Sequence, residues 1–244
     1  MTEIAPAVDV HRGPTLDRER LVDCYADGVA AVRRVASRYT RADWGAATPC
    51  PGWTAQDLAG HLRATAVEAT ESADSHSISM LLTEEELAEH NAKQIASLPA
   101  SDGPGHVAEF VNSATAYVGL ARRMWQRPSY RYREQLWTVG HNVGVLAVEW
   151  HVHAWDLAVA IGQEHRPADP VALATAFCEG MAYLQIGAGE PWAAVLKAAG
   201  RHVPASPRRG RGITSSLLDR AGHAIEDVFV VVLDNGERMR RRLP

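Results

Sequence analysis

Residues 143–160 read VGVLAVEWHVHAWDLAVA, and this stretch decides the fold. The apolar spacing predicts a long helix from about Trp137 to Ile161, because Gly162 is then placed to end it. One stripe of this helix, spaced by threes and fours, holds Leu146, Glu149, His153, Asp156 and Ala160. Ionisable side chains therefore stand where a bundle helix ordinarily places leucine. A carboxylate that faces a core is costly unless it is paired or binds a metal.

A second inward-facing histidine, His61, is expected in residues 48–62, which read TPCPGWTAQDLAGHL. Thr54 and Asp57 form a capping-box pattern that predicts a helix from about Thr54. His61 lies in the apolar stripe of this helix. If the two helices are neighbours, His61 converges with Glu149 and His153. Two histidines and one glutamate are the ligand set of an open divalent metal site.

Other interpretations of these residues remain open at this point. A single histidine on an apolar stripe is usually a core residue with a hydrogen-bond partner, and a glutamate four residues before a histidine often forms a salt bridge. His151 points away from His153 on a helix. On a strand, His151 and His153 would share a face and form a different site.

The remaining chain predicts a mostly α fold, a four-helix bundle with a long crossover and a short C-terminal α+β extension. Further helices are expected from about Pro14 to Tyr39, from Val107 to Trp125 and, capped by Asp169, from Pro170 to Leu184. The polar crossover from Ser72 to Gly105 holds one short helix begun by Thr83 and Glu86. A terminal hairpin is expected from Val228 to Leu243. The expected divisions are a flexible terminus at 1–14, a bundle at 15–189 and an extension at 190–244.

The composition of the 244 residues is that of an ordinary globular protein, with 46% hydrophobic and 22% charged residues and a net charge of −4. No signal peptide or long apolar stretch occurs, so we expect a cytoplasmic protein that does not contact a membrane. The three cysteines contain no C-x-x-C pair, which excludes a cysteine zinc knuckle. Arginines cluster after residue 200 without interleaved aromatic residues, so nucleic-acid binding is not expected.

The segments 48–62 and 149–162 together resemble the mycothiol-dependent maleylpyruvate isomerase family of the DinB/YfiT-like metalloprotein superfamily, with similarity over about residues 15–185. The resemblance implies a helical bundle that holds a divalent metal at His61, Glu149 and His153. The metal is often zinc, with nickel, manganese and iron as alternatives. Mycothiol is the implied cosubstrate, and it would supply the thiol nucleophile.

The implied function is an isomerase or thiol transferase that acts on a small electrophilic or unsaturated acid. Only about 55 residues follow Gly189, so we expect the second domain of the isomerase to be truncated or divergent here, and maleylpyruvate is not carried over as the substrate. One alternative is a thiol-independent lyase, hydrolase or cyclase on the same bundle. Another is a binding protein with a stress or regulatory role and no catalysis.

Further residues are candidates for supporting roles. Asp156 is placed to accept the free ring N–H of a ligand histidine, to cap a core tryptophan or to pair with an arginine. His141 either approaches the mouth of the site or packs structurally. Cys50 reads as a small packed residue rather than a nucleophile. Trp53 and Trp155 are either pocket walls or plain core residues. Arg63, together with Arg122 or Arg123, either holds a carboxylate of the cosubstrate or is solvated on a helix surface. The crossover is expected to form a lid or a homodimer contact.

Overall fold

The computed structural model describes residues 13–75, 78–81, 84–132, 135–180, 186–187, 189–201 and 231–233. Its elements follow one another along the chain as α1 (Arg18–Ala36), a 3-10 turn η1 (Asp43–Gly45), α2 (Ala55–Ser75), β1 (Ser79–Leu81), α3 (Glu84–Ser97), α4 (Gly103–Arg123), β2 (Pro128–Tyr132), β3 (Gln135–Thr138), α5 (Val139–Ala160), α6 (Pro170–Gly180), α7 (Pro191–Ala198) and β4 (Val231–Leu233). None of the described helices is long and apolar enough to cross a membrane.

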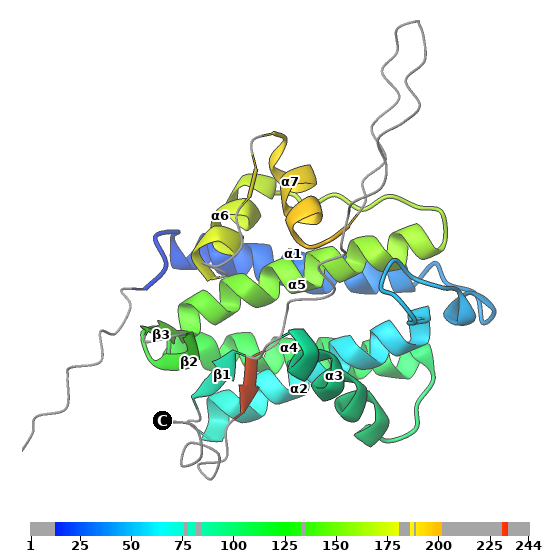
Figure 1. The fold of residues 1–244 in the computed structure, drawn as a ribbon, viewed down its shortest axis with the longest axis horizontal. Helices are drawn as coiled ribbons and strands as arrows, with labels where there is room; N and C mark the ends of the chain where they lie inside the picture. Colours follow the sequence, from blue (N-terminus) through cyan, green and yellow to red (C-terminus); the bar gives the residue numbers. More distant parts are fainter. Residues whose placement is uncertain are drawn as a thin grey trace, which may run out of the picture.

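Four long helices form the predicted bundle (Figure 1). α1 packs along α5 and α2 packs along α4, while α2 also touches α5. The connection from α2 to α4 carries β1 and the short helix α3, which packs back on α2. The structure therefore confirms the mostly α bundle and its long crossover.

Local capping explains where several helices begin. At the start of α2, the backbone N–H of Thr54 donates to the Asp57 carboxylate at 2.9 Å, and the Asp57 N–H donates to the Thr54 hydroxyl at 3.2 Å. This is the predicted capping box. Asp169 caps α6 by accepting from the Ala172 N–H at 3.0 Å. Such caps satisfy N–H groups that the first turn of a helix leaves without partners.

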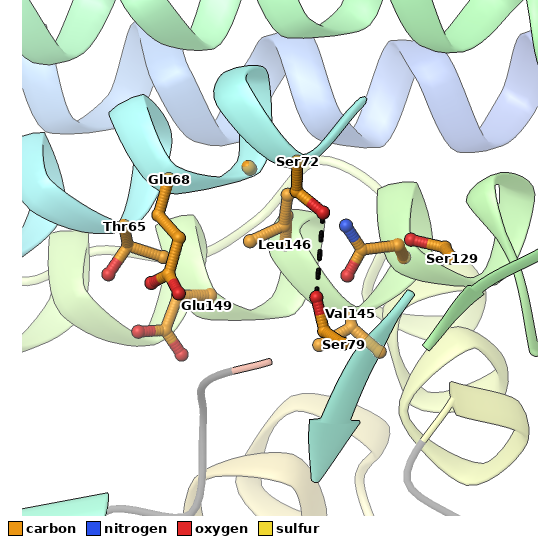
Figure 2. A pocket seen from close by; sticks show the side chains of 10 residues that line it. Thr65, Glu68, Ser72, Ser79, Ser129, Val145, Leu146 and Glu149 are labelled. Atoms are coloured by element: carbon orange, nitrogen blue, oxygen red, sulfur yellow. Dashed lines mark hydrogen bonds between the residues drawn. The ribbon is translucent and has the colours of Figure 1, made fainter. Parts of the chain in front are cut away.

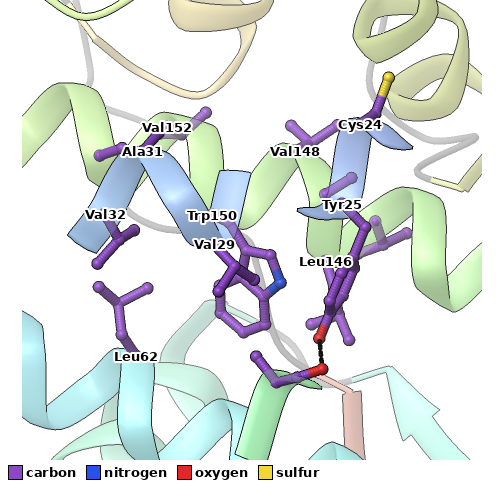
Figure 3. Close-up of a cluster of buried hydrophobic side chains, with 14 of the residues drawn as sticks. Cys24, Tyr25, Val29, Ala31, Val32, Leu62, Leu146, Val148, Trp150 and Val152 are labelled. Carbon is purple, nitrogen blue, oxygen red and sulfur yellow. Dashed lines mark hydrogen bonds between the residues drawn. The ribbon is translucent and has the colours of Figure 1, made fainter. Parts of the chain in front are cut away.

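The core is centred on α5, which is apolar around most of its circumference (Figure 3). Trp150 is fully buried there, and its ring lies edge-on to the rings of Phe110 and Tyr25 with centroid separations of 4.9 and 6.0 Å. The Tyr25 hydroxyl donates to the Ala114 carbonyl at 3.0 Å, which ties α1 to α4. A helix buried on so many sides can hold polar side chains only where partners meet them.

The predicted start of the fourth bundle helix is wrong by two residues. Trp137 belongs to β3, and α5 begins at Val139 with Thr138 as its N-cap. The preceding residues form an antiparallel pair, β2 with β3, in which the Tyr130 and Trp137 rings stack at 5.9 Å. Cross-strand aromatic pairs of this kind stabilise a hairpin against helix continuation.

Within the described residues, four short strands form one sheet in the order β3-β2-β1-β4. β1 runs parallel to β2 and antiparallel to β4. Val231–Leu233 is therefore a strand, as expected, but its described partner is β1 from the crossover. The second half of the expected hairpin, 237–243, lies outside the described residues, as do residues 181–184 of the expected fifth helix.

Candidate metal centre

The three predicted ligand residues meet between α2 and α5. Nε2 of His61 and Nε2 of His153 each lie 3.0 Å from Oε1 of Glu149. The ligand atoms of the three residues all lie within 4.8 Å of one another, and each residue is at most 2% exposed. Glu149 and His153 converge because residues four apart on α5 share a face. His61 joins them because α2 packs against this face.

The second nitrogen of His153 is held by a chain of charged groups. Nδ1 of His153 lies 2.9 Å from Oδ2 of Asp156, which is fully buried. The Arg201 guanidinium donates to both oxygens of this carboxylate, from Nη2 to Oδ2 at 2.7 Å and from Nε to Oδ1 at 3.1 Å. This arrangement sets the orientation of the His153 ring and leaves Nε2 facing Glu149.

The charges at the site are matched inside the protein. Burial raises the pKa of Glu149, but the attraction and hydrogen bonds of His153 and His61 together outweigh burial and hold the pKa at about 2. Burial likewise acts to raise the pKa of Asp156, yet His153 and Arg201 hold it at about 2. Burial lowers the pKa of His153, and attraction to Glu149 outweighs this effect, so its pKa is well above the usual range. In the absence of a metal, His153 and Arg201 therefore balance the two carboxylates, and a divalent cation bound at Nε2 of His153 would take the place of its proton.

The donor set fits a divalent cation. Oε2 of Glu149 is buried without a hydrogen-bond partner among the described residues. A buried carboxylate oxygen without a donor is costly, and a cation bound between the two Nε2 atoms and Glu149 would satisfy it. The set of two imidazoles and one carboxylate suits zinc and similar metals, and it leaves a position for water or substrate. Nδ1 of His61 also lacks a described partner.

Cys50 lies nearer the site than its place in the sequence suggested. Its Sγ is 3.4 Å from Oδ2 of Asp156, 3.3 Å from Nη2 of Arg201 and 3.9 Å from Nδ1 of His153. Burial raises the pKa of the Cys50 thiol to about 11. The thiol is therefore protonated near neutral pH, which makes it a poor nucleophile and a good packing residue.

The other histidine candidates lie elsewhere. Nδ1 of His141 accepts from the Thr138 backbone N–H at 3.4 Å and lies 3.0 Å from the Thr138 hydroxyl, so this side chain completes the cap of α5. Because His141 precedes Glu149 by eight residues on α5, it lies about 12 Å from it along the helix axis. His151 faces α1, where Nε2 lies 3.1 Å from the Cys24 carbonyl. The strand interpretation is wrong, because both His151 and His153 lie on α5.

Of the aromatic and arginine candidates, Trp53 is the one that reaches the site. Its ring centroid lies 4.9 Å from that of His61, so it forms a wall beside this residue. Arg63 donates instead to the Pro99 carbonyl at 3.4 Å, and Arg122 pairs with Glu19 at 2.6 Å. Trp155 packs against the core cluster. Arg123 donates to the Gly119 carbonyl of its own helix.

Sequence reasoning missed Arg201 entirely. It lies beyond α7 in the predicted extension, and no local motif marks it. The one signal was Asp156, whose inward position called for a partner such as an arginine without indicating which one.

Comparison with solved structures finds crystal structures of the mycothiol-dependent maleylpyruvate isomerase. A histidine-to-alanine mutant of that protein gives a TM-score of 0.48 at 16% identity, and the protein without that mutation gives 0.47 at 17% identity. Each alignment covers 58% of this chain and 61% of the other, so this chain spans about three fifths of the length of the solved proteins. Among curated proteins, no match is found.

The family model described as the mycothiol maleylpyruvate isomerase N-terminal domain matches residues 25–158. This segment runs from within α1 to near the end of α5, and it contains His61, Glu149, His153 and Asp156. The match covers more than half of the chain. The protein therefore belongs to the mycothiol maleylpyruvate isomerase N-terminal domain family.

Proposed function

We propose that the protein is a metal-dependent enzyme that uses mycothiol to isomerise, or to transfer a thiol to, a small electrophilic or unsaturated acid. The observation that carries this proposal is the convergence of His61, Glu149 and His153 in a buried site of a chain that belongs to this family. A divalent metal held by these residues would lower the pKa of a bound thiol, so that a thiolate forms at neutral pH.

The protein's own groups define the rest of the site. Asp156 and Arg201 hold the His153 ring so that its Nε2 stays directed at Glu149. Cys50 is protonated near neutral pH, which supports a nucleophile that comes from a cosubstrate. Addition of an external thiolate to an activated double bond, rotation about the resulting single bond and elimination of the same thiolate would isomerise the substrate and regenerate the thiol.

The metal assignment is tested by elemental analysis of the purified protein. We expect close to one equivalent of divalent metal per chain, lost in His61→Ala and in His153→Ala. His151→Ala is the matched control, since this buried histidine lies on α5 but faces α1. Full metal content in both ligand variants would contradict the assignment.

The thiol assignment is tested separately by adding mycothiol to the cobalt-substituted protein. Sulfur bound to cobalt produces a charge-transfer band, and we expect this band to appear as mycothiol is titrated. If no band appears at millimolar thiol, the thiol-independent lyase or hydrolase becomes the better interpretation of the same site.

A further inference from the structure

A groove with a volume of about 390 Å³ lies between α1 and α4 in the part of the chain that the structure describes. Around the bundle, α1 contacts α5, α5 contacts α2, α2 contacts α4 and α4 contacts α1. The α1–α4 groove is therefore opposite the seam of α2 and α5, where the candidate metal centre lies. The cavity beside Glu149 on that other seam has a volume of only about 20 Å³, enough for one water molecule (Figure 2). The α1–α4 groove, by contrast, has the size of a small-molecule site.

Small side chains leave the α1–α4 groove open. On α1, Ala36 and Ser37 follow Arg33 by three and four residues, so the three share one face. The residues of α4 that line the groove recur with the same helical spacing and are Pro104, Val107, Ala108, Val111 and Asn112. Facing helices normally fill such a seam with interdigitating side chains. Here Ala36, Ser37 and Ala108 are too short to fill it, and an apolar space remains.

One wall of the groove is already fixed in the free protein. Trp44 of η1 is 6% exposed, and its ring centroid lies 4.6 Å from that of Tyr39. The Tyr39 hydroxyl donates in turn to the Leu157 carbonyl at 2.7 Å. A Cβ atom at Gly103 would lie 2.1 Å from Cδ2 of Trp44, so this glycine lets the ring pack directly against the start of α4. A wall that needs no rearrangement lowers the entropic cost of binding a ligand.

The two helices each present one polar side chain that is available to a ligand. Arg33 on α1 and Asn112 on α4 are exposed, and neither side chain has a partner among the described residues. The next residue along the chain, Arg34, is instead paired with Asp27 at 3.2 Å. Among the described residues that line the groove, Arg33 is the only charged one. A guanidinium beside an apolar surface, without a counter-charge, favours a ligand that carries a carboxylate.

We propose that the α1–α4 groove binds a small monocarboxylate with an apolar body, at a site separate from the candidate metal centre. The apolar body packs against Trp44, Val107 and Val111, and the carboxylate accepts hydrogen bonds from Arg33 and Asn112. The inference goes beyond the proposed function and does not rest on it, because none of the candidate metal ligands lines this groove.

The charge preference is tested by calorimetric titration of the full-length protein with three probes of one shape: 4-phenylbutyrate, 4-phenylbutan-1-ol and 4-phenylbutan-1-amine. We expect 4-phenylbutyrate to bind with a dissociation constant of about 1 mM. The alcohol should bind about 3- to 10-fold more weakly, and the amine more weakly still. Arg33→Met should remove the preference for the acid over the alcohol, whereas the control Arg34→Met should retain it. Equal binding of acid and alcohol to the unsubstituted protein would overturn the inference.

The location is tested by filling the groove. Ala108 lines it and is exposed, so Ala108→Phe should fold normally and weaken 4-phenylbutyrate binding at least about 10-fold. Ala116→Phe is the matched control, because Ala116 is also exposed on α4 but does not line the groove. Undiminished binding to Ala108→Phe would place the acid elsewhere, such as at the metal centre, and would overturn the inference. Sedimentation would overturn it as well if the protein is a dimer that Ala108→Phe separates, because a second copy then fills the groove. If Ala108→Phe does not fold, the comparison of Arg33→Met with Arg34→Met still decides.

Discussion

Replacement of Arg201 by methionine tests whether the charged groups that hold the His153 ring, Asp156 and Arg201, stabilise the site. Methionine keeps much of the length and apolar volume of arginine but removes the guanidinium from Asp156. Asp156 is fully buried and Arg201 is 6% exposed, so Arg201→Met leaves a carboxylate in the core without one of its two positively charged partners. Removing one partner of a buried ion pair typically costs about 3–5 kcal/mol.

The cost converts into a measurable shift. For a chain of this length, 1 kcal/mol corresponds to about 2–4 °C in melting temperature. Arg201→Met should therefore lower the melting temperature by about 6–20 °C when measured with a chelator at pH 7. The chelator is needed because bound metal stabilises the folded state by mass action.

Two further variants make the result interpretable. Arg122→Met removes an arginine whose pair with Glu19 is solvent-exposed, and it should change the melting temperature far less. The double variant Arg201→Met with Asp156→Asn removes both charges and should recover much of the loss, because no buried charge remains unpaired. The reasoning is refuted if Arg201→Met costs no more than Arg122→Met, or if the double variant is less stable than the single one.

Two other predictions concern the metal ligands and the far side of α5. Asp156→Asn should weaken zinc binding about 10- to 100-fold in competition with a chromophoric chelator, because the His153 ring loses its charged partner; Asp169→Asn, at the start of α6, should not. Burial lowers the pKa of His151 and of His165 to about 4, so both stay neutral in the folded state while the unfolded chain binds protons below pH 6.5. The free energy of unfolding should thus be highest above pH 6.5 and decrease toward pH 4. At pH 5, one such imidazole lowers it by about 2 kcal/mol. Urea titrations at pH 7 and pH 5 measure this decrease. If the free energy of unfolding of His165→Gln decreases as much as that of the unsubstituted protein, the result argues against this prediction.

The sequence alone was sufficient for the bundle because its helices repeat their apolar residues with helical spacing and begin at recognisable caps. Thr54 with Asp57 at α2 and Asp169 at α6 are local signals that depend on a few neighbouring residues. The same locality explains the inward positions of His61, Glu149 and His153, since helix geometry fixes which residues share a face.

The strands around Trp137 were missed for the opposite reason. β2 and β3 are short, and their pairing depends on contacts such as the stack of Tyr130 on Trp137 rather than on a long periodic pattern. β1 and β4 pair across about 150 residues, between Ser79–Leu81 and Val231–Leu233. No local spacing can indicate a partner that far away.

Sequence by itself therefore determined the helices and which ionisable side chains face inward, because both follow from the helical repeat. Only the tertiary structure decided which of these side chains meet. It brought His61 of α2 to Glu149 and His153 of α5, and it brought Arg201 from beyond α7 to Asp156. Buried charges need partners, and the packing of distant segments decides which partners are within reach.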